Sequence, residues 1–176
     1  MSDSPPLTIS RLNGLPTAEF IQTLGGIFEK SPWVAERASA ARPFSTRDAL
    51  LQKMIAVVDS AGPEPLLDLI RAHPDLGARL QERAALTPES RREQGGAGLF
   101  TIEESELERL RRFNKSYSEK FGFPFIICAR LSSLDTIFES IQCRLGNSCE
   151  QETAEAWRQI QKIASLRLTD LVTETP

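Results

Sequence analysis

The stretch SCEQETAEAWRQIQKIASLRLTDL, residues 148–171, decides the fold because apolar residues recur along it at helical spacing. At 100° per residue, with Trp157 at 0°, its apolar side chains span an arc from about 240° to about 20°. Ser148 and Gln151 match a capping box, which marks the start of a helix. The sequence therefore predicts one long helix with a single buried face.

Arg167 is the exception to this pattern, because it falls inside the apolar arc at about 280°. A guanidinium at a buried position needs anionic or carbonyl partners, since it cannot lose its charge. Two interpretations stay open. Arg167 is either a structural ion pair or snorkelling side chain, or a residue that binds a ligand.

Shorter helical patterns fill most of the remaining chain. Pro16-Thr17 and Ser31-Pro32 each open a segment with apolar residues at helical spacing, and Ser45 to Asp48 approximates a capping box before a third. Residues 75–85 and 103–121 are amphipathic, and a further helix begins at Ser133 or Asp135. Turn signals separate the helices at Gly25-Gly26, Arg42-Pro43, Gly62-Pro63, Gly122 and Gly146-Asn147.

The run Phe123–Ala129 is apolar throughout and contains Pro124, so it could be a buried strand or a core helix. A lone strand has nothing to pair with in a helical chain. We therefore expect an extended entry over residues 122–124 followed by helix. The run is either plain core or the wall of a pocket with available backbone groups near Pro124.

The helical patterns predict an all-α fold of about eight helices, and the length of 176 residues suits one compact domain over residues 1–176, with residues 1–6 flexible. The net charge of −3 is spread over interspersed acids and bases, which excludes a basic surface for nucleic acid or membrane. The chain shows neither a signal peptide nor a membrane span, so we expect a cytoplasmic protein. Three cysteines without a CxxC motif favour reduced thiols, and a single histidine makes a zinc site improbable.

His73, the only histidine, ends an apolar helix face that carries Leu66, Leu69 and Ile70. Pro74 disfavours helical geometry for the residue before it, so the helix should end at about His73. An imidazole at this end lies in the negative potential of the helix dipole, which favours its protonated form. His73 is therefore a candidate acid, although a lone histidine is more often structural.

Glu93 is predicted to lie in the last turn of a helix, where a negative charge is unfavourable. Thr87-Pro88 signals a helix start, and Gly95-Gly96 ends that helix soon after, which leaves Glu93 in the last turn. The dipole disfavours a carboxylate there. The alternative is a solvated acid within a charged run. The glycine cluster is no phosphate loop, because it follows a helix and lacks a lysine.

Six stretches occur together in one order: SPW at 31–33, RPF at 42–44, AHPDLG at 72–77, SRREQGGAGL at 90–99, FGFPFIICAR at 121–130 and KIASLRL at 162–168. In this combination the chain resembles the 2-oxo-4-hydroxy-4-carboxy-5-ureidoimidazoline (OHCU) decarboxylases, from about Leu7 to Leu171. The resemblance implies an all-helical, cofactor-free enzyme that acts after urate oxidase and hydroxyisourate hydrolase and releases CO₂ to give (S)-allantoin. It also implies a homodimer and possible functional association with those two enzymes. The chain end Glu174-Thr175-Pro176 is no peroxisomal address, which agrees with a cytoplasmic location.

The resemblance assigns catalysis to His73, Glu93 and Arg167, the three unusual polar residues. It also implies a substrate-binding set, which comprises Pro74, Ser90, Arg91, Arg92, Glu93, Gln94, Phe125, Ile126, Ile127, Cys128 and Ala129. The roles of His73 and Glu93 as proton donor and orienting group are interchangeable at this point. The alternative function is a non-catalytic helical ureide-binding or regulatory module on the same scaffold.

Overall fold

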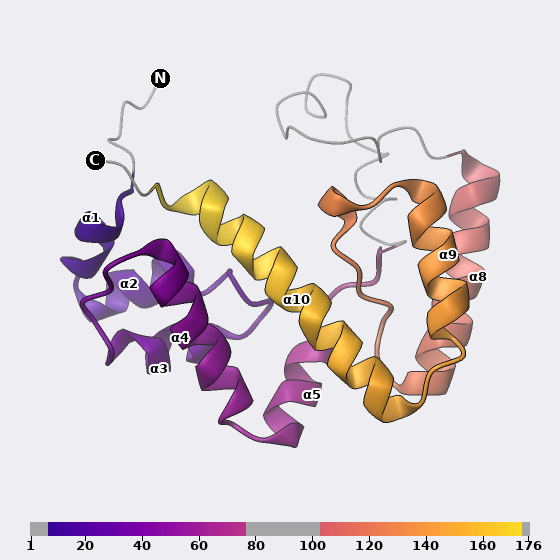
Figure 1. Ribbon diagram of the computed structural model, residues 1–176, viewed down its shortest axis with the longest axis horizontal. Coiled ribbons are helices and arrows are strands. Elements are labelled where there is room, and N and C mark those ends of the chain that lie inside the picture. The colour runs from indigo at the N-terminus through magenta and orange to yellow at the C-terminus, as the bar shows by residue number, and fades with distance from the viewer. Residues whose placement is uncertain (1–6, 77–102, 174–176) are drawn as a thin grey trace. The chain divides into compact units, whose positions relative to one another are not determined.

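The computed structural model describes residues 7–76 and 103–173, which are almost entirely helical (Figure 1). They form eight α-helices, one short 3₁₀ helix and a single isolated bridge between Thr8 and Thr173. The all-α prediction is confirmed. No helix in these two ranges is long and apolar enough to cross a membrane.

The chain divides into two compact units, of residues 1–72 with 161–176 and of residues 73–160. The first unit contains five helices and the end of a sixth. These are α1 (Ile9–Asn13), α2 (Thr17–Leu24), α3 (Pro32–Ser39), α4 (Arg47–Asp59), α5 (Pro63–Arg71) and the last part of α10 (Cys149–Leu171). Helix α3 packs against both α2 and α4. The single-domain organisation stays a prediction.

The core of the first unit is built from the apolar faces that the sequence marks. Phe20 and Leu24 of α2, Leu50 and Met54 of α4, and Ile70 of α5 are all fully buried. The start of α4 differs from expectation. Its N-cap is Thr46 rather than Ser45, because the Thr46 hydroxyl accepts the Ala49 N–H at 3.0 Å.

The second unit contains α8 (Glu104–Phe121), η1 (Ala129–Leu131), α9 (Leu134–Arg144) and the first part of α10. Figure 1 shows α8 and α9 packed side by side. Gly122 ends α8 in the left-handed conformation, with φ of 76°, and Ser133 caps α9. At the start of α10 the Ser148 hydroxyl accepts the Gln151 N–H, so the predicted capping box is confirmed.

The segment between α8 and α9 corrects one prediction. Residues 124–128 are extended rather than helical, and only the 3₁₀ turn Ala129–Leu131 follows. Helix formation would have satisfied the backbone groups within the segment. Side chains of α9 and α10 bind them instead, at Ile126 and Cys128.

The three cysteines are free thiols, as the sequence predicts. All three cysteines lie in the described part of the chain, and none forms a disulfide. Cys128 is buried in the extended segment, while Cys143 and Cys149 are exposed on or beside the helices of the second unit.

Candidate active site

His73 lies immediately after α5 and is 5% exposed. The helix ends as predicted, since its C-cap is Ala72, whose N–H donates to the Asp68 carbonyl at 2.9 Å. Pro74 then leads the chain away from the helix. The imidazole is therefore buried next to a helix C-terminus, where the dipole favours a positive charge.

The turn after His73 is tied to the buried face of α8. Asn114, which is buried in that helix, donates from Nδ2 to Oδ1 of Asp75 at 3.5 Å. Tyr117 lies three residues further on the same face and packs edge-on against Phe125, with ring centroids 5.3 Å apart. One helix face thus contacts both the turn of His73 and the predicted substrate-binding segment.

The extended segment is buried and rigidly held. Phe125, Ile126, Ile127 and Cys128 are all less than a tenth exposed. The Arg144 guanidinium lies 4.6 Å from the Phe125 ring and donates from Nη1 to the Ile126 carbonyl at 2.8 Å. These contacts hold in place a buried backbone that has no regular secondary structure.

Arg144 belongs to a buried ionic cluster with Glu152 and Tyr117. Its Nε donates to Glu152 Oε1 at 2.7 Å, and its Nη2 contacts the same oxygen. The Tyr117 hydroxyl also donates to Glu152, while Asn147 donates to Oε2 at 2.8 Å. Burial, followed by the hydrogen bond to Glu152, raises the pKa of Tyr117 far above its usual value.

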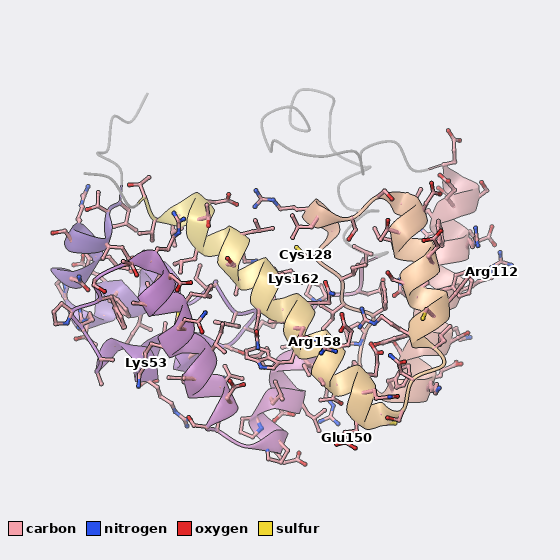
Figure 2. The ribbon with its side chains drawn as sticks, in the orientation of Figure 1. Lys53, Arg112, Cys128, Glu150, Arg158 and Lys162 are labelled. Atoms are coloured by element: carbon pink, nitrogen blue, oxygen red, sulfur yellow. The ribbon has the colours of Figure 1, made fainter. Side chains whose placement is uncertain are left out.

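A second network of hydrogen-bonded side chains, from α10, contacts the segment at Cys128. The Cys128 N–H donates to Gln159 Oε1 at 3.0 Å. Figure 2 labels Cys128 together with Arg158, the neighbour of Gln159 on α10. Gln159 donates in turn to Glu155 at 2.7 Å, and Arg158 Nε donates to the other Glu155 oxygen at 2.9 Å.

Arg167 makes its contacts within the first unit. Its Nη1 donates to the carbonyls of Gly26 and Ile27 at 3.0 and 3.2 Å, and its Nη2 pairs with Glu29 at 2.8 Å. The side chain is 26% exposed. The guanidinium therefore has the anionic and carbonyl partners that its place on the apolar arc requires, and it still reaches solvent.

The structure places the remaining predicted residues as follows. His73, Pro74 and the segment Phe125–Ala129 belong to the second unit, and Arg167 belongs to the first. Their assembly into one site is part of the proposal below. Glu93, the set Ser90–Gln94 and the predicted helix start at Thr87 lie outside the described residues.

Several residues of the site region escaped the sequence analysis. Arg144 follows the buried Ile137 and Ile141 at spacings of i+7 and i+3, so the test that singled out Arg167 would also have found it. Glu152 falls at about 220° on the same projection, outside the apolar arc, so this test would have missed it although its side chain is fully buried. Glu29 lies in the turn between α2 and α3, where helical periodicity gives no information about burial or partners.

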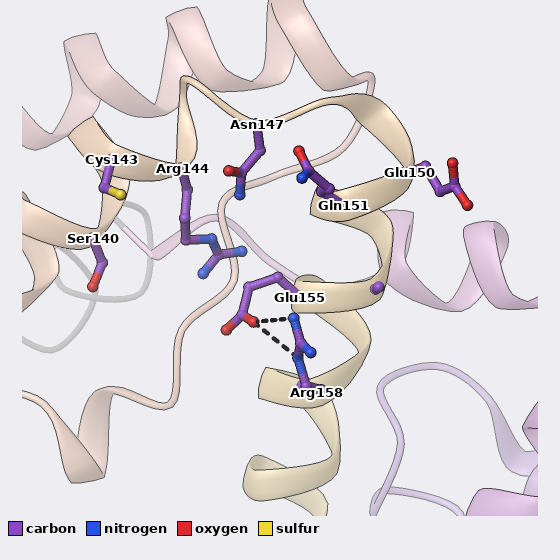
Figure 3. A pocket seen from close by; sticks show the side chains of 9 residues that line it. Ser140, Cys143, Arg144, Asn147, Glu150, Gln151, Glu155 and Arg158 are labelled. Atoms are coloured by element: carbon purple, nitrogen blue, oxygen red, sulfur yellow. Dashed lines mark hydrogen bonds and ion pairs between the residues drawn. The ribbon is translucent and has the colours of Figure 1, made fainter.

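Two cavities in the described residues contain none of the predicted site residues. A cavity of about 790 Å³ lies between α9 and α10, and Figure 3 shows the Glu155–Arg158 ion pair on its wall. A smaller cavity of about 310 Å³ in the first unit is lined by Trp33, Arg37 and Ala72 among others.

The chain is similar to proteins named as OHCU decarboxylases and to a protein named for uric acid degradation. A family model described as OHCU decarboxylase matches residues 13–169. The 2-oxo-4-hydroxy-4-carboxy-5-ureidoimidazoline decarboxylase of Halalkalicoccus jeotgali is 39% identical over 165 residues, which cover 94% of this chain and 92% of that protein. The uric acid degradation bifunctional protein of Bacillus subtilis is 40% identical over 167 residues, or 95% of this chain and 33% of that protein.

Solved structures agree. A crystal structure of (S)-allantoin synthase matches with a TM-score of 0.77 and 31% identity, over 96% of this chain and 54% of that chain. A crystal structure of an OHCU decarboxylase in the presence of (S)-allantoin matches with a TM-score of 0.62 and 25% identity, over 79% of this chain and 89% of that one.

Proposed function

The chain belongs to the OHCU decarboxylase family, and we propose from this premise that it converts 2-oxo-4-hydroxy-4-carboxy-5-ureidoimidazoline to (S)-allantoin and CO₂ in urate degradation. The observation that carries the proposal is the family match over residues 13–169, which spans both units of the structure. The segment Phe125–Ala129, to which the family resemblance assigns substrate binding, agrees with this proposal, because its irregular backbone carries peptide groups that resemble a ureide.

The substrate explains why no cofactor is needed. Its carboxylate is attached to a carbon next to a C=N bond, so the electron pair left by CO₂ can move into the imine. The protein must stabilise the developing negative charge, control the hydroxyl proton and deliver a proton to one face of the carbon. Delivery to one face gives the (S) enantiomer, whereas unassisted breakdown gives both.

We assign these tasks to three residues. His73 is the acid, either as imidazolium or as a donor tautomer, because it is buried next to the C-terminus of α5. Glu93 accepts a hydrogen bond from the substrate hydroxyl and orients His73 or the substrate. Arg167 binds anionic or carbonyl oxygens of the substrate. The roles of His73 and Glu93 can be exchanged without changing the set.

The backbone of the extended segment supports ureide binding. Arg144 donates a hydrogen bond to the Ile126 carbonyl, and Gln159 accepts one from the Cys128 N–H. Within the described ranges, the structure records no hydrogen bond to the backbone groups of Ile127, which lies between them. A ureido group carries the same donors and acceptors as a peptide group, so it can pair with such a backbone.

The test generates the unstable substrate in place from urate, using urate oxidase and hydroxyisourate hydrolase, and follows (S)-allantoin by circular dichroism. We expect the chain to accelerate formation of an optically active product, and His73→Asn to abolish the acceleration while the protein stays folded. A racemic product at the spontaneous rate would instead support the non-catalytic ureide-binding module.

We further propose a cytoplasmic homodimer that functions alongside the two preceding enzymes. The family resemblance supports the dimer, and the bifunctional relative in Bacillus subtilis supports a link to other steps of uric acid degradation. Light scattering on the purified chain tests the dimer: a mass near 39 kDa is expected, twice that of the 19.6 kDa chain.

A further inference from the structure

The backbone of the segment Phe125–Ala129 is fixed by a polar side chain at Cys128. The Cys128 N–H donates to Gln159 Oε1 at 3.0 Å, and both residues are buried. A buried N–H without a partner costs free energy, so this bond selects one position of the segment. Ser132 Oγ and the Leu131 N–H bind the carbonyl side of the same residue.

Glu155 determines which end of the Gln159 amide faces Cys128. Gln159 Nε2 donates to Glu155 Oε1 at 2.7 Å, and an ionised carboxylate can only accept hydrogen bonds. The NH₂ end must therefore face Glu155, which turns the carbonyl oxygen toward the Cys128 N–H. A reversed amide would place two acceptors together on one side and two donors together on the other.

Arg158 keeps Glu155 in this position from the cavity side of α10. Its Nε and Nη2 donate to Glu155 Oε2 at 2.9 and 2.8 Å, as the dashed lines in Figure 3 show. Burial raises the pKa of Glu155, but the hydrogen bonds from Gln159 and Arg158 outweigh it and hold that pKa below its ordinary value. Glu155 is therefore ionised at neutral pH.

We propose that Gln159, oriented by Glu155, is a positioning residue for the decarboxylation, because it fixes the substrate-binding backbone of Phe125–Ala129 through Cys128. The inference rests on the proposed function, which supplies the substrate-binding role of the segment. A misplacement of about 1 Å at such a segment costs about 100-fold in rate. The contribution of Gln159 should appear mainly in kcat, since it holds geometry rather than touching substrate.

The first experiment compares Gln159→Met with Gln142→Met in the coupled assay. Methionine keeps most of the glutamine volume but makes neither hydrogen bond, and Gln142 is an exposed residue of α9 that serves as the matched control. We expect Gln159→Met to lower kcat about 10- to 100-fold with a smaller change in KM, and Gln142→Met to match wild type.

A reciprocal swap separates positioning from general packing. Gln159→Glu alone places two carboxylates together, whereas Glu155→Gln/Gln159→Glu restores a donor facing an acceptor and leaves an oxygen for the Cys128 N–H. We expect the single variant to lose activity and the swapped pair to regain it. This comparison also replaces the first if Gln159→Met does not fold.

The outcomes are distinct. An inactive wild-type chain would overturn the proposed function and this inference with it. An active wild type with kcat unchanged in Gln159→Met would overturn the positioning role alone. A swapped pair no more active than Gln159→Glu would also count against it. Faster hydrogen exchange at the Cys128 amide in Gln159→Met, without a change in Gln142→Met, would support it.

Discussion

Replacing Arg144 by methionine should destabilise the protein strongly, because it leaves a buried carboxylate without its cation. The Arg144 side chain is 9% exposed and that of Glu152 is 0% exposed. Arg144 also binds the Ile126 carbonyl at 2.8 Å. Removing one member of such a buried pair costs about 3–5 kcal/mol. For a chain of this length each kcal/mol lowers Tm by about 2–4 °C, so a decrease of about 6–20 °C is expected.

Urea denaturation and thermal melting followed by far-ultraviolet circular dichroism measure this effect. The control is Arg158→Met, which removes an arginine from an ion pair whose arginine is 64% exposed and should cost less than about 1 kcal/mol. The double variant Arg144→Met/Glu152→Met should be more stable than the sum of the two single changes predicts, because no unpaired charge remains. An Arg144→Met variant within about 1 kcal/mol of wild type would refute the reasoning.

Three further predictions follow from single residues. Tyr117 is the only tyrosine, so phenolate absorbance reports on it alone: the folded chain should show no phenolate near pH 10, and stability should fall as the pH rises above 10, where the unfolded tyrosine ionises. For Glu155, whose pKa is lowered in the fold, the stabilisation is present above pH 4.5 and lost as the pH falls below it, so the Tm of Glu155→Gln should approach that of wild type in acid. Arg167→Lys should lower kcat/KM about 10- to 150-fold through the loss of a charge-assisted hydrogen bond of about 1.5–3 kcal/mol, with a smaller effect on Tm. A loss of activity that is fully explained by a lower fraction of folded protein in the melting curve would instead show that Arg167 only stabilises the fold through Glu29.

The sequence predicted the helices well where local rules act. Proline at the first turn, a hydroxyl cap and a left-handed glycine each act within a few residues, so the starts of α3 and α9 and the end of α8 agree with expectation. The shift of the α4 cap from Ser45 to Thr46 shows the limit, since both hydroxyls satisfy the same rule.

The segment Phe125–Cys128 shows what local rules cannot decide. Its apolar composition suits a core helix, and the sequence analysis accordingly predicted one. The extended form is stable because Arg144 and Gln159, which lie 18 and 31 residues away from their partners, bind backbone groups that a helix would have satisfied internally. No periodicity within the segment carries that information.

The sequence by itself determined the all-helical class, the buried position of His73 at a helix end and the conflict between Arg167 and its apolar face, because these depend on spacing along one helix. Only the tertiary structure decided which partners the charges find. Glu29 pairs with Arg167 across 138 positions of sequence, and Glu152 pairs with Arg144 between two helices. A charged residue on an apolar helix face can be recognised from the sequence, and its burial requires a partner. The packing of helices determines which residue is that partner, because it brings together residues that no local sequence pattern relates.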